Sequence, residues 1–410
     1  MVEGFKHTEV GFIPNDWEIK ELRDICDITS SKRIFESDYV NIGVPFYRGK
    51  EISLLNENKK LEEEYFISEE KYEAIKKTFG APTKGDILIT AVGTLGNVYF
   101  VPNNDRFYFK DGNLIWLRNI KNVLPSYFSI QLNWLRKEII NNAIGSSQKA
   151  LTIVVLKKQF IPLPPTKAEQ TAIATALNDT DALIQKLEHL IAKKRNIKTG
   201  AMQELLKPKE GWEVKKLGEI GDFKNGINKN NEDFGFGFPF VNLLDVFGKS
   251  KISSNTHLGL INANDNDRKI YDLREGDVLF ILSSVKPEGV GLTVLIDKKL
   301  EETVFSGFII RFRDRGYLSK EFKNHCFHSE DFRKRLISKS SVSANTNISQ
   351  DALKNLDLSY PKDKTEQTHI AQILSDMDNE IQELEKQLEK YKMMKQGMMQ
   401  SLLTGKIRLV

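Results

Sequence analysis

The sequence predicts an α+β protein with two tandem globular domains, each followed by a long helix that pairs with the other helix. Three observations lead to this prediction. The chain repeats itself at a fixed spacing, each copy contains short apolar runs typical of strands, and each copy ends in a segment with apolar residues at heptad spacing. The expected boundaries are 1–165 and 208–360 for the domains, and 166–207 and 361–410 for the helices.

The internal repeat is strongest in the two helical segments. Residues 169–206 and 366–403, which lie 197 positions apart, share 19 identities in 38 positions. The globular parts repeat more weakly: the segment around Trp17 returns around Trp212, and a Gly-Asp pair ahead of an apolar run occurs in both copies. The chain is therefore a duplication of roughly 195 residues.

Each globular copy is expected to form a small curved sheet with helices. Short apolar runs that follow Gly-Asp or Gly-containing turns are typical of strands. The expected strands are 87–92, 98–101 and 114–117 in the first copy and 278–282, 292–296 and 308–312 in the second, with helical stretches at 126–142 and 319–337.

The two long helices carry an apolar seam with alternating spacings of three and four residues. This spacing is the signal of a coiled coil, and prolines before each segment and at 208 fit its ends. The alternative is that each helix packs on its own domain. Lys198 and Lys395 occupy the same seam position, where they either fix the register or extend from the seam edge. The seam residues are Ile184, Leu187, Ile191, Lys198, Ile381, Leu384, Leu388 and Lys395.

Composition and charge limit the classes of protein that fit. The 410 residues include 60 Lys+Arg and 56 Asp+Glu, a formal net charge of +4, and 40% are hydrophobic. These values are typical of a folded chain and exclude a protein with a basic excess over its whole surface. Any DNA-binding face must therefore be local.

Neither a membrane span nor a secretory signal is expected. No run approaches roughly 18 apolar residues, and the first residues lack the apolar core of a signal peptide. The two cysteines, Cys26 and Cys326, are too few for a disulfide scaffold. The cytoplasm is therefore the expected compartment.

Sequence motifs of catalysis are absent. No phosphate-binding Gly-x-x-x-x-Gly-Lys-Ser/Thr segment occurs. The glycine clusters at 93–96 and 234–238 are interpreted as loops before strands, although the second resembles a fragment of a methyltransferase motif. His325 and His328 are interpreted as an incidental pair on a helix surface, without a second ligand pair at zinc spacing. No catalytic residue and no metal site are therefore expected.

Three polar loops at matching places in both copies are the candidate DNA contacts. Short polar and cationic side chains on loops can reach phosphates and base edges, and solvated loop composition is the alternative for any single loop. Arg48 corresponds to Asn242, and these residue types favour guanine and adenine, respectively. The candidate DNA-binding residues are Lys32, Arg33, Arg48, Lys50, Gln148, Lys149, Lys224, Asn225, Lys229, Asn242, Asn345 and Thr346.

Two variable domains, each followed by a near-repeated Glu-Gln-x-x-Ile-Ala…Leu-Leu helix, resemble the specificity subunit of type I restriction–modification systems. The resemblance covers the full chain and is strongest in Glu169–Leu206 and Glu366–Gly405. Further matches are Trp17-Glu18, Trp212-Glu213 and Ile161–Pro164. The first helix departs from the second by ending without the Thr404-Gly405 pair.

The resemblance implies a non-catalytic subunit in which each domain is a target recognition domain for one half of a bipartite site on double-stranded DNA. It also implies that the paired helices set the spacer and dock two methyltransferase subunits, with restriction helicase–nuclease subunits completing the complex. No cofactor is expected in this chain, because S-adenosylmethionine would bind the methyltransferase subunits. Antiparallel pairing of the helices is expected, since parallel pairing would place both domains at the same end.

Two other classes of function stay open at this point. One is a methyltransferase or nuclease fused to recognition domains, which the missing catalytic motifs disfavour. The other is a coiled-coil protein scaffold, which would show no salt-dependent affinity for DNA.

Overall fold

A computed structural model describes the chain except residues 1–3, 57–58, 62–63, 144–149, 343 and 410. Two compact units are present, one formed by Met1–Leu187 with Gln387–Val410 and the other by Glu188–Lys386. Each long helix contributes residues to both units, so the units do not coincide with the four expected segments. The two units are described separately.

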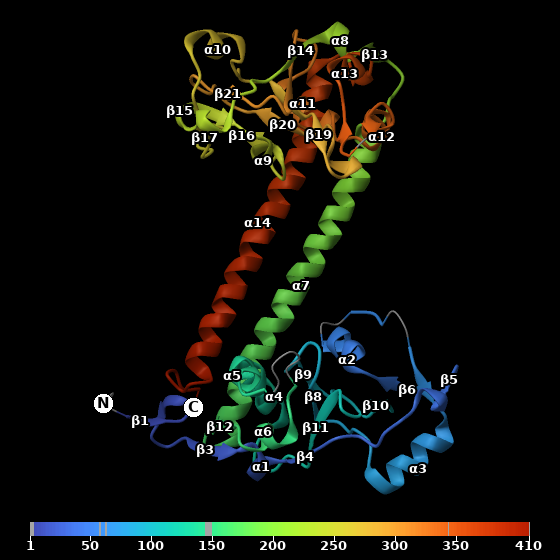
Figure 1. Ribbon diagram of the computed structural model, residues 1–410, viewed down its shortest axis with the longest axis vertical. Coiled ribbons are helices and arrows are strands. Elements are labelled where there is room, and N and C mark those ends of the chain that lie inside the picture. The colour runs from blue at the N-terminus through green and yellow to red at the C-terminus, as the bar shows by residue number, and fades with distance from the viewer. Residues whose placement is uncertain (1–3, 57–58, 62–63, 144–149, 343, 410) are drawn as a thin grey trace. The chain divides into compact units, whose positions relative to one another are not determined.

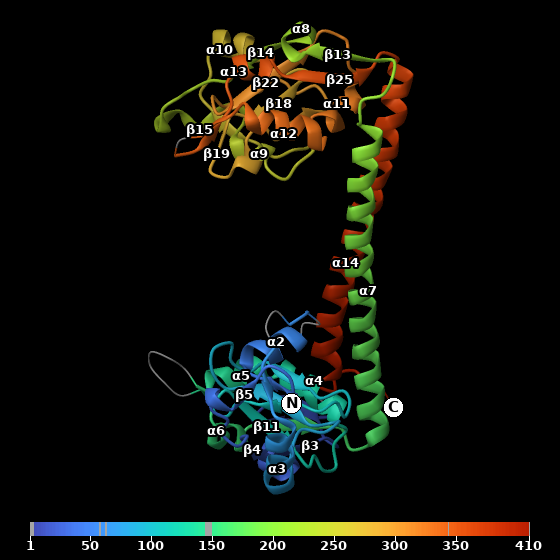
Figure 2. The same cartoon turned by 90° about the vertical axis from the view of Figure 1, so that its right-hand side faces the viewer.

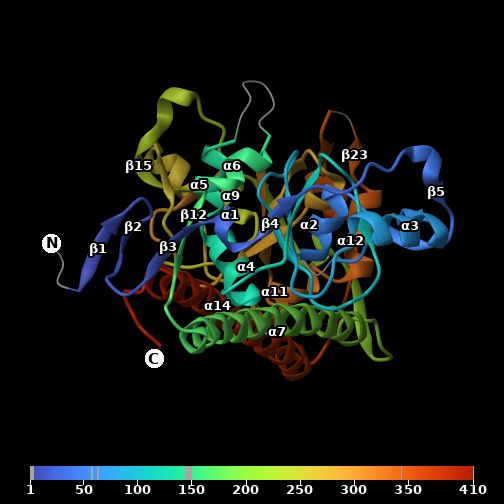
Figure 3. The same ribbon diagram turned by 90° about the horizontal axis from the view of Figure 1, so that it is seen from below.

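The first unit contains a four-stranded antiparallel sheet, β4-β11-β8-β9, and a second four-stranded sheet, β10-β6-β7-β5 (Figure 1). The hairpin β1-β2 and the pair β12-β3 complete it (Figure 3). Its strands are β1 (Phe5–Thr8), β2 (Gly11–Pro14), β3 (Glu18–Glu21), β4 (Asp27–Thr29), β5 (Tyr39–Val40), β6 (Val44–Tyr47), β7 (Phe66–Ile67), β8 (Ile87–Thr90), β9 (Val98–Phe100), β10 (Tyr108–Phe109), β11 (Leu114–Arg118) and β12 (Phe160–Leu163). Its helices are α1 (Leu22–Ile25), η1 (Glu36–Asp38), α2 (Gly49–Asn56), α3 (Glu69–Phe79), α4 (Pro125–Trp134), α5 (Arg136–Asn141), α6 (Ile153–Lys157) and the first part of α7 (Lys167–Leu205).

The second unit repeats this plan. Its main sheet is β14-β22-β18-β20-β16, beside the sheets β17-β15-β21 and β19-β24-β23 and the pair β13-β25 (Figure 2). Its strands are β13 (Trp212–Lys216), β14 (Gly221–Asn225), β15 (Phe234–Val241), β16 (Lys251–Ile252), β17 (Gly259–Ile261), β18 (Val278–Ile281), β19 (Ser283–Ser284), β20 (Thr293–Ile296), β21 (Val304–Phe305), β22 (Ile309–Asp314), β23 (Ser341–Val342), β24 (Thr346–Asn347) and β25 (Asp357–Pro361). Its helices are α8 (Leu217–Ile220), η2 (Asn231–Asp233), α9 (Leu243–Val246), α10 (Asp265–Ile270), η3 (Pro287–Gly289), α11 (Lys320–Cys326), α12 (Glu330–Ser338), α13 (Gln350–Lys354) and the first part of α14 (Lys364–Leu402).

The α+β prediction is confirmed, and all six expected strands are present as β8, β9, β11, β18, β20 and β22. Each expected helical stretch is two helices, α4 with α5 and α11 with α12. The interpretation of residues 234–238 as a loop is wrong, because they belong to β15, whose pairing with β17 shifts register between Phe234 and Phe238. Gly235 and Gly237 there have φ near +95°, which only glycine adopts without strain.

The Gly-Asp pair of the repeat has a structural role in both units. Asp86 is buried and accepts hydrogen bonds from the Thr83 backbone at 2.9 Å and the Trp116 indole at 3.0 Å. Asp277 is also buried and accepts a hydrogen bond from the Arg274 backbone at 2.8 Å, and its two oxygens accept from Nε and Nη2 of Arg313 at 2.8 and 2.7 Å. Each carboxylate therefore holds the turn that leads into the central strand of its main sheet.

The two long helices pair in antiparallel orientation within each unit, as expected. In the first unit, Lys395 of α14 forms an ion pair with Asp181 of α7 at 2.5 Å. In the second unit, Lys198 of α7 forms an ion pair with Asp378 of α14. Asp378 lies 197 positions after Asp181, and Lys395 lies 197 after Lys198, so the two pairs are equivalent in the repeat.

The apolar seam residues of both helices are buried or half-buried. Exposed fractions are 8% for Ile184, 8% for Leu187, 4% for Ile191, 7% for Ile381 and 9% for Leu388, whereas Leu384 is half-buried. The apolar positions of the predicted seam are therefore shielded from solvent, as a helix-pairing seam requires. The two seam lysines keep 24–29% of their side chains exposed, so they extend from the seam edge to reach an aspartate.

A buried glutamine joins each long helix to its globular part. The Gln170 side chain accepts a hydrogen bond from the Leu124 backbone at 2.8 Å and donates to the Pro164 carbonyl at 3.2 Å. Gln367 accepts from Ser319 at 2.6 Å and donates to the Pro361 carbonyl at 2.8 Å. These equivalent hydrogen bonds are the structural reason for the repeated glutamine at the start of each helix.

The end of the chain packs on the first unit. Arg408 binds the carboxylate of Glu169, which is fully buried, and that of Asp16 at 2.9 Å. Gly405 has φ +70°, and a Cβ there would lie 2.4 Å from Pro14. The C-terminal segment therefore closes the first unit around the beginning of α7.

Among the described residues, no helix is both long and apolar enough to cross a membrane.

Candidate nucleic-acid interface

The third polar loop of the second unit lies beside the other two. The Gln350 side-chain amide hydrogen-bonds Asn225, which connects the end of the third loop to the first. β24 in the third loop pairs with β19, and Asn345 lines the same pocket as Leu243, which follows Asn242 of the second loop. Loops separated by more than 100 residues in the sequence therefore form one surface.

Several candidate residues of this surface already have partners. Lys229 forms an ion pair with Asp267 at 2.9 Å, and its hydrogen bond holds the pKa of that carboxyl below its usual range. The Lys224 ammonium lies 5.5 Å from the centre of the Tyr271 ring. Asn242 caps α9 by accepting a hydrogen bond from the Leu243 backbone at 2.7 Å.

Candidate residues of the third loop differ in exposure. Asn345 is exposed, whereas Thr346 is 3% exposed within β24. A side chain buried to this degree does not reach a base edge without a rearrangement, so Asn345 is the better placed of the two.

In the first unit, the first and second loops meet at β10. Arg33 forms an ion pair with Asp111 at 2.8 Å, and the Lys32 backbone donates to the Tyr108 hydroxyl at 2.8 Å. Tyr47, next to Arg48, pairs with Phe109 of β10. Lys50 is exposed near the start of α2. Gln148 and Lys149 lie outside the described residues.

Arg48 is held firmly inside the first unit. Its guanidinium donates to both oxygens of Glu51, at 3.1 and 2.8 Å, and lies 4.1 Å from the centre of the Tyr65 ring. Glu51 is 2% exposed, and burial opposes its charge while the Arg48 hydrogen bonds favour it, with a net lowering of its pKa. Contact between Arg48 and a guanine stays a prediction, and it would require Arg48 to exchange or share this partner.

An apolar pocket on the second unit was missed by the sequence reasoning. Its volume is about 640 Å³, and its lining includes Phe247, Val285 and Phe308, with Lys286 and Asn345 at the same site. Phe308 is 58% and Val285 81% exposed. The apolar run 308–312 predicts that Phe308 belongs to a strand, whereas β22 begins at Ile309. Comparing the two repeats position by position would have shown that Asn113 stands in the place of Phe308.

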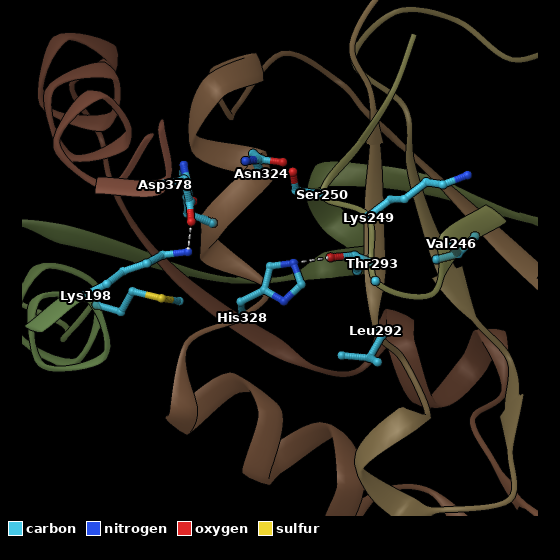
Figure 4. A pocket seen from close by; sticks show the side chains of 12 residues that line it. Lys198, Val246, Lys249, Ser250, Leu292, Thr293, Asn324, His328 and Asp378 are labelled. Carbon is cyan, nitrogen blue, oxygen red and sulfur yellow. Dashed lines mark hydrogen bonds and ion pairs between the residues drawn. The ribbon is translucent and has the colours of Figure 1, made fainter. Parts of the chain in front are cut away.

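A second pocket, of about 420 Å³, lies between α7, α11 and β20 of the second unit (Figure 4). The interpretation of His325 and His328 as a pair on a helix surface is wrong, because His325 is 3% exposed and His328 is half-buried just after α11. Their Nε2 atoms lie 3.0 Å from the hydroxyls of Ser375 and Thr293, respectively. Burial lowers the pKa of both imidazoles to about 4, so both are neutral at pH 7.

The part of the chain that the structure describes contains no cluster of three or more histidine, cysteine or carboxylate side chains able to hold a metal ion. In the second unit, carboxylates form ion pairs with arginine and lysine, as the buried Asp277 does with Arg313.

A sequence model of the type I restriction modification DNA specificity domain matches residues 14–195 and again 209–391. The two matches together cover most of the chain, once for each repeat. The chain belongs to this family. As a member of the type I DNA specificity domain family, it carries two copies of the domain, each including a globular part and most of the following long helix.

Curated relatives are specificity subunits by name. One protein of Methanocaldococcus jannaschii, provisionally named as the specificity subunit of type I restriction enzyme MjaX, is 29% identical over 60% of this chain and 63% of its own length. The chain therefore matches less than two thirds of that relative. The MjaVIII specificity subunit of the same organism is 24% identical over 99% of this chain and 96% of its own length.

Solved structures share the fold of this family member. The type I restriction–modification S subunit from M. genitalium aligns with a TM-score of 0.56 at 15% identity, over 98% of this chain and 99% of that one. A chain from a structure on complex assembly and conformational transition of the type I R-M system aligns with a TM-score of 0.58 at 17% identity, over 96% and 99%.

Proposed function

We propose that this chain is the DNA sequence-specificity subunit of a type I restriction–modification complex, with each unit recognising one half of a bipartite DNA site. The observation that carries the proposal is the duplication of one specificity domain with the same sheet framework and different loop residues. Repeated frameworks with different side chains at matching loops are suited to two different half-sites, because base contacts specify sequence while the framework positions them.

Exchange of one domain tests this proposal. Residues 1–165 are replaced by those of another family member, and the methylated DNA motif is mapped in cells that carry the complete system. One half of the motif should change and the other half should stay. A change in both halves, or in neither, would contradict separate recognition by the two domains.

The long helices are proposed to set the distance between the half-sites and to dock two methyltransferase subunits. Support comes from apolar side chains that the seam leaves exposed. In the second unit, Leu190 and Ile197 of α7 are 38% and 46% exposed at a spacing of seven residues. In the first unit, Met393 and Met394 of α14 are 66% and 43% exposed. Apolar side chains exposed at heptad spacing, as Leu190 and Ile197 are, are suited to a partner helix.

Substitution of the exposed stripe tests the docking. Ile197→Glu should reduce co-purification of the methyltransferase subunits, because a charge would then have to be buried at the contact. Asn196→Glu is the matched control, since Asn196 is the exposed neighbour on the same helix. Equal recovery of the partner with both variants would place the docking surface elsewhere.

The chain itself is proposed to be non-catalytic and without a cofactor. Methylation, with S-adenosylmethionine, and cleavage, by restriction helicase–nuclease subunits, are assigned to the partners. Both cysteines are free buried thiols, in keeping with action in the reducing cytoplasm. The purified chain, incubated with DNA and labelled S-adenosylmethionine, should transfer no methyl group, and transfer by the chain alone would overturn this assignment.

A further inference from the structure

The apolar pocket of the second unit stands at a position that the repeat makes comparable between the two units. In the first unit, the Ala91 backbone donates to the Asn113 carbonyl at 2.8 Å, and the Leu151 backbone donates to the Ala91 carbonyl at 2.9 Å. In the second unit, Leu282 donates to the Phe308 carbonyl at 2.9 Å, and Ile348 donates to the Leu282 carbonyl at 2.9 Å. Phe308 therefore occupies the place of Asn113.

The same comparison applies to Val285. It lies three residues after Leu282, as Thr94 lies three residues after Ala91. Thr94 is exposed, and Val285 is 81% exposed. One framework thus presents polar side chains in the first unit and large apolar side chains in the second.

Exposed apolar side chains that gather at one site, as Phe247, Val285 and Phe308 do, mark an interaction surface. The surroundings of the pocket favour DNA. Ser283, Ser284 and Lys286 line it together with the apolar residues, and serine and lysine are depleted at protein–protein interfaces. Glu288 also lines the pocket and is its acidic member. The segment 339–350, which carries Asn345, contains one lysine and no acidic residue.

The shape of this region also suits a DNA groove. β23 and β24, each two residues long, pair in antiparallel orientation at the edge of a three-stranded sheet whose third strand is β19. A two-stranded ribbon fits the major groove, where the C5-methyl group of thymine is the apolar feature of the base edges. Phenylalanine and other apolar side chains contact this methyl group.

We propose that Phe308 and Val285 receive the C5-methyl group of a thymine, so that the half-site recognised by the second unit contains an A·T pair selected through its methyl group. The inference rests on the proposed function and adds which chemical group of one base the second unit recognises. Asn345, which lines the same pocket, has the amide that pairs with adenine, the partner base of that thymine.

Deoxyuridine provides the test, because it differs from thymidine only by the missing methyl group. The full chain in complex with its methyltransferase subunits is measured against the mapped site, with each thymine of the second half-site replaced in turn. Replacement at one position should weaken binding about fourfold, as expected for one buried methyl-sized group. Replacement in the half-site of the first unit should have no comparable effect.

Substitutions tie this effect to the pocket. Phe308→Asn introduces the residue of the first repeat at an exposed position, and it should remove the sensitivity to deoxyuridine. Phe236→Asn is the matched control, because Phe236 is 53% exposed in the same unit but does not line the pocket. This control should keep the fourfold sensitivity.

Three outcomes would overturn the inference. One is a second half-site without thymine, and another is specific binding that does not change with deoxyuridine at any position; both leave the proposed function intact. A third is loss of methyltransferase subunits from the Phe308→Asn protein with no deoxyuridine effect in the wild type, which would make the pocket a protein interface. Absence of any sequence-specific binding by the wild-type complex would instead contradict the proposed function itself.

Discussion

Replacement of Gln367 by alanine should destabilise the second unit strongly. The Gln367 side chain is fully buried and makes three hydrogen bonds, one accepted from the Ser319 backbone and two donated to the carbonyls of Pro361 and Tyr317. It therefore ties the start of α14 to the end of β25 and to the beginning of α11. Removal of the amide leaves three backbone groups without this partner.

The magnitude follows from these three groups. A buried polar group that loses its partner costs about 1–3 kcal/mol. Partial entry of water lowers the sum, so we expect the free energy of unfolding to fall by about 3–5 kcal/mol. Gln170→Ala removes two hydrogen bonds in the first unit and should cost less, about 2–3 kcal/mol.

Two measurements check the prediction. Urea unfolding gives the stability change, and amide hydrogen exchange of Ser319 reports on the lost hydrogen bond directly. Gln367→Met, which keeps the side-chain length without the amide, separates hydrogen bonding from cavity formation. Thr368→Ala is the exposed control and should stay within about 0.5 kcal/mol of the wild type.

A change below about 0.5 kcal/mol for Gln367→Ala, together with unchanged exchange at Ser319, would refute the reasoning. It would mean that the amide contributes no net stability to the junction between helix and domain.

Three further outcomes are expected. Arg408→Ala should destabilise the first unit more at pH 7 than at pH 3, because Arg408 holds the pKa of Asp16 below its usual range and this contribution is lost as the pH falls; equal urea midpoint shifts at both pH values would contradict it. Lys198→Asp should lower the free energy of unfolding by about 0.3–1 kcal/mol, and adding Asp378→Lys in the same chain should restore it, because the ion pair is then reversed. A double-mutant cycle without coupling between the two positions would show that this ion pair contributes no stability. The second unit should lose stability as the pH falls from about 6.5 towards 4, because burial lowers the pKa of both His325 and His328 to about 4 while the unfolded state takes up these protons earlier. His325→Gln should remove one of the two contributions and so weaken this dependence in urea titrations, and an unchanged dependence would contradict it.

The architecture could be predicted from the sequence because local patterns of apolar residues determine its strands and helices. The six expected strands of the two main sheets follow from short apolar runs, and the paired helices follow from heptad spacing in segments 197 positions apart. Neither pattern needs knowledge of distant contacts. The duplication also located the Glu-Gln pairs at the start of α7 and α14, although their hydrogen bonds to backbone groups 46 and 48 residues away could not be foreseen.

The candidate DNA contacts were chosen by residue type, and residue type does not determine whether a side chain is exposed or paired. Lys229 is engaged by Asp267, which is 38 residues away, and Thr346 is buried by strand pairing with β19. Whether these residues contact DNA stays a prediction.

The sequence by itself determined the repeated α+β plan, the strands and the helical seam, since periodicity and duplication act through near neighbours and like segments. Only the tertiary structure decided which loop residues form ion pairs or hydrogen bonds. It also decided that His325 is buried and that Phe308, although it belongs to an apolar run, is exposed. The physical reason is that burial and ion pairing depend on which distant segments meet. The packing of the whole unit determines which distant segments come into contact, and the local spacing of residues does not specify these contacts.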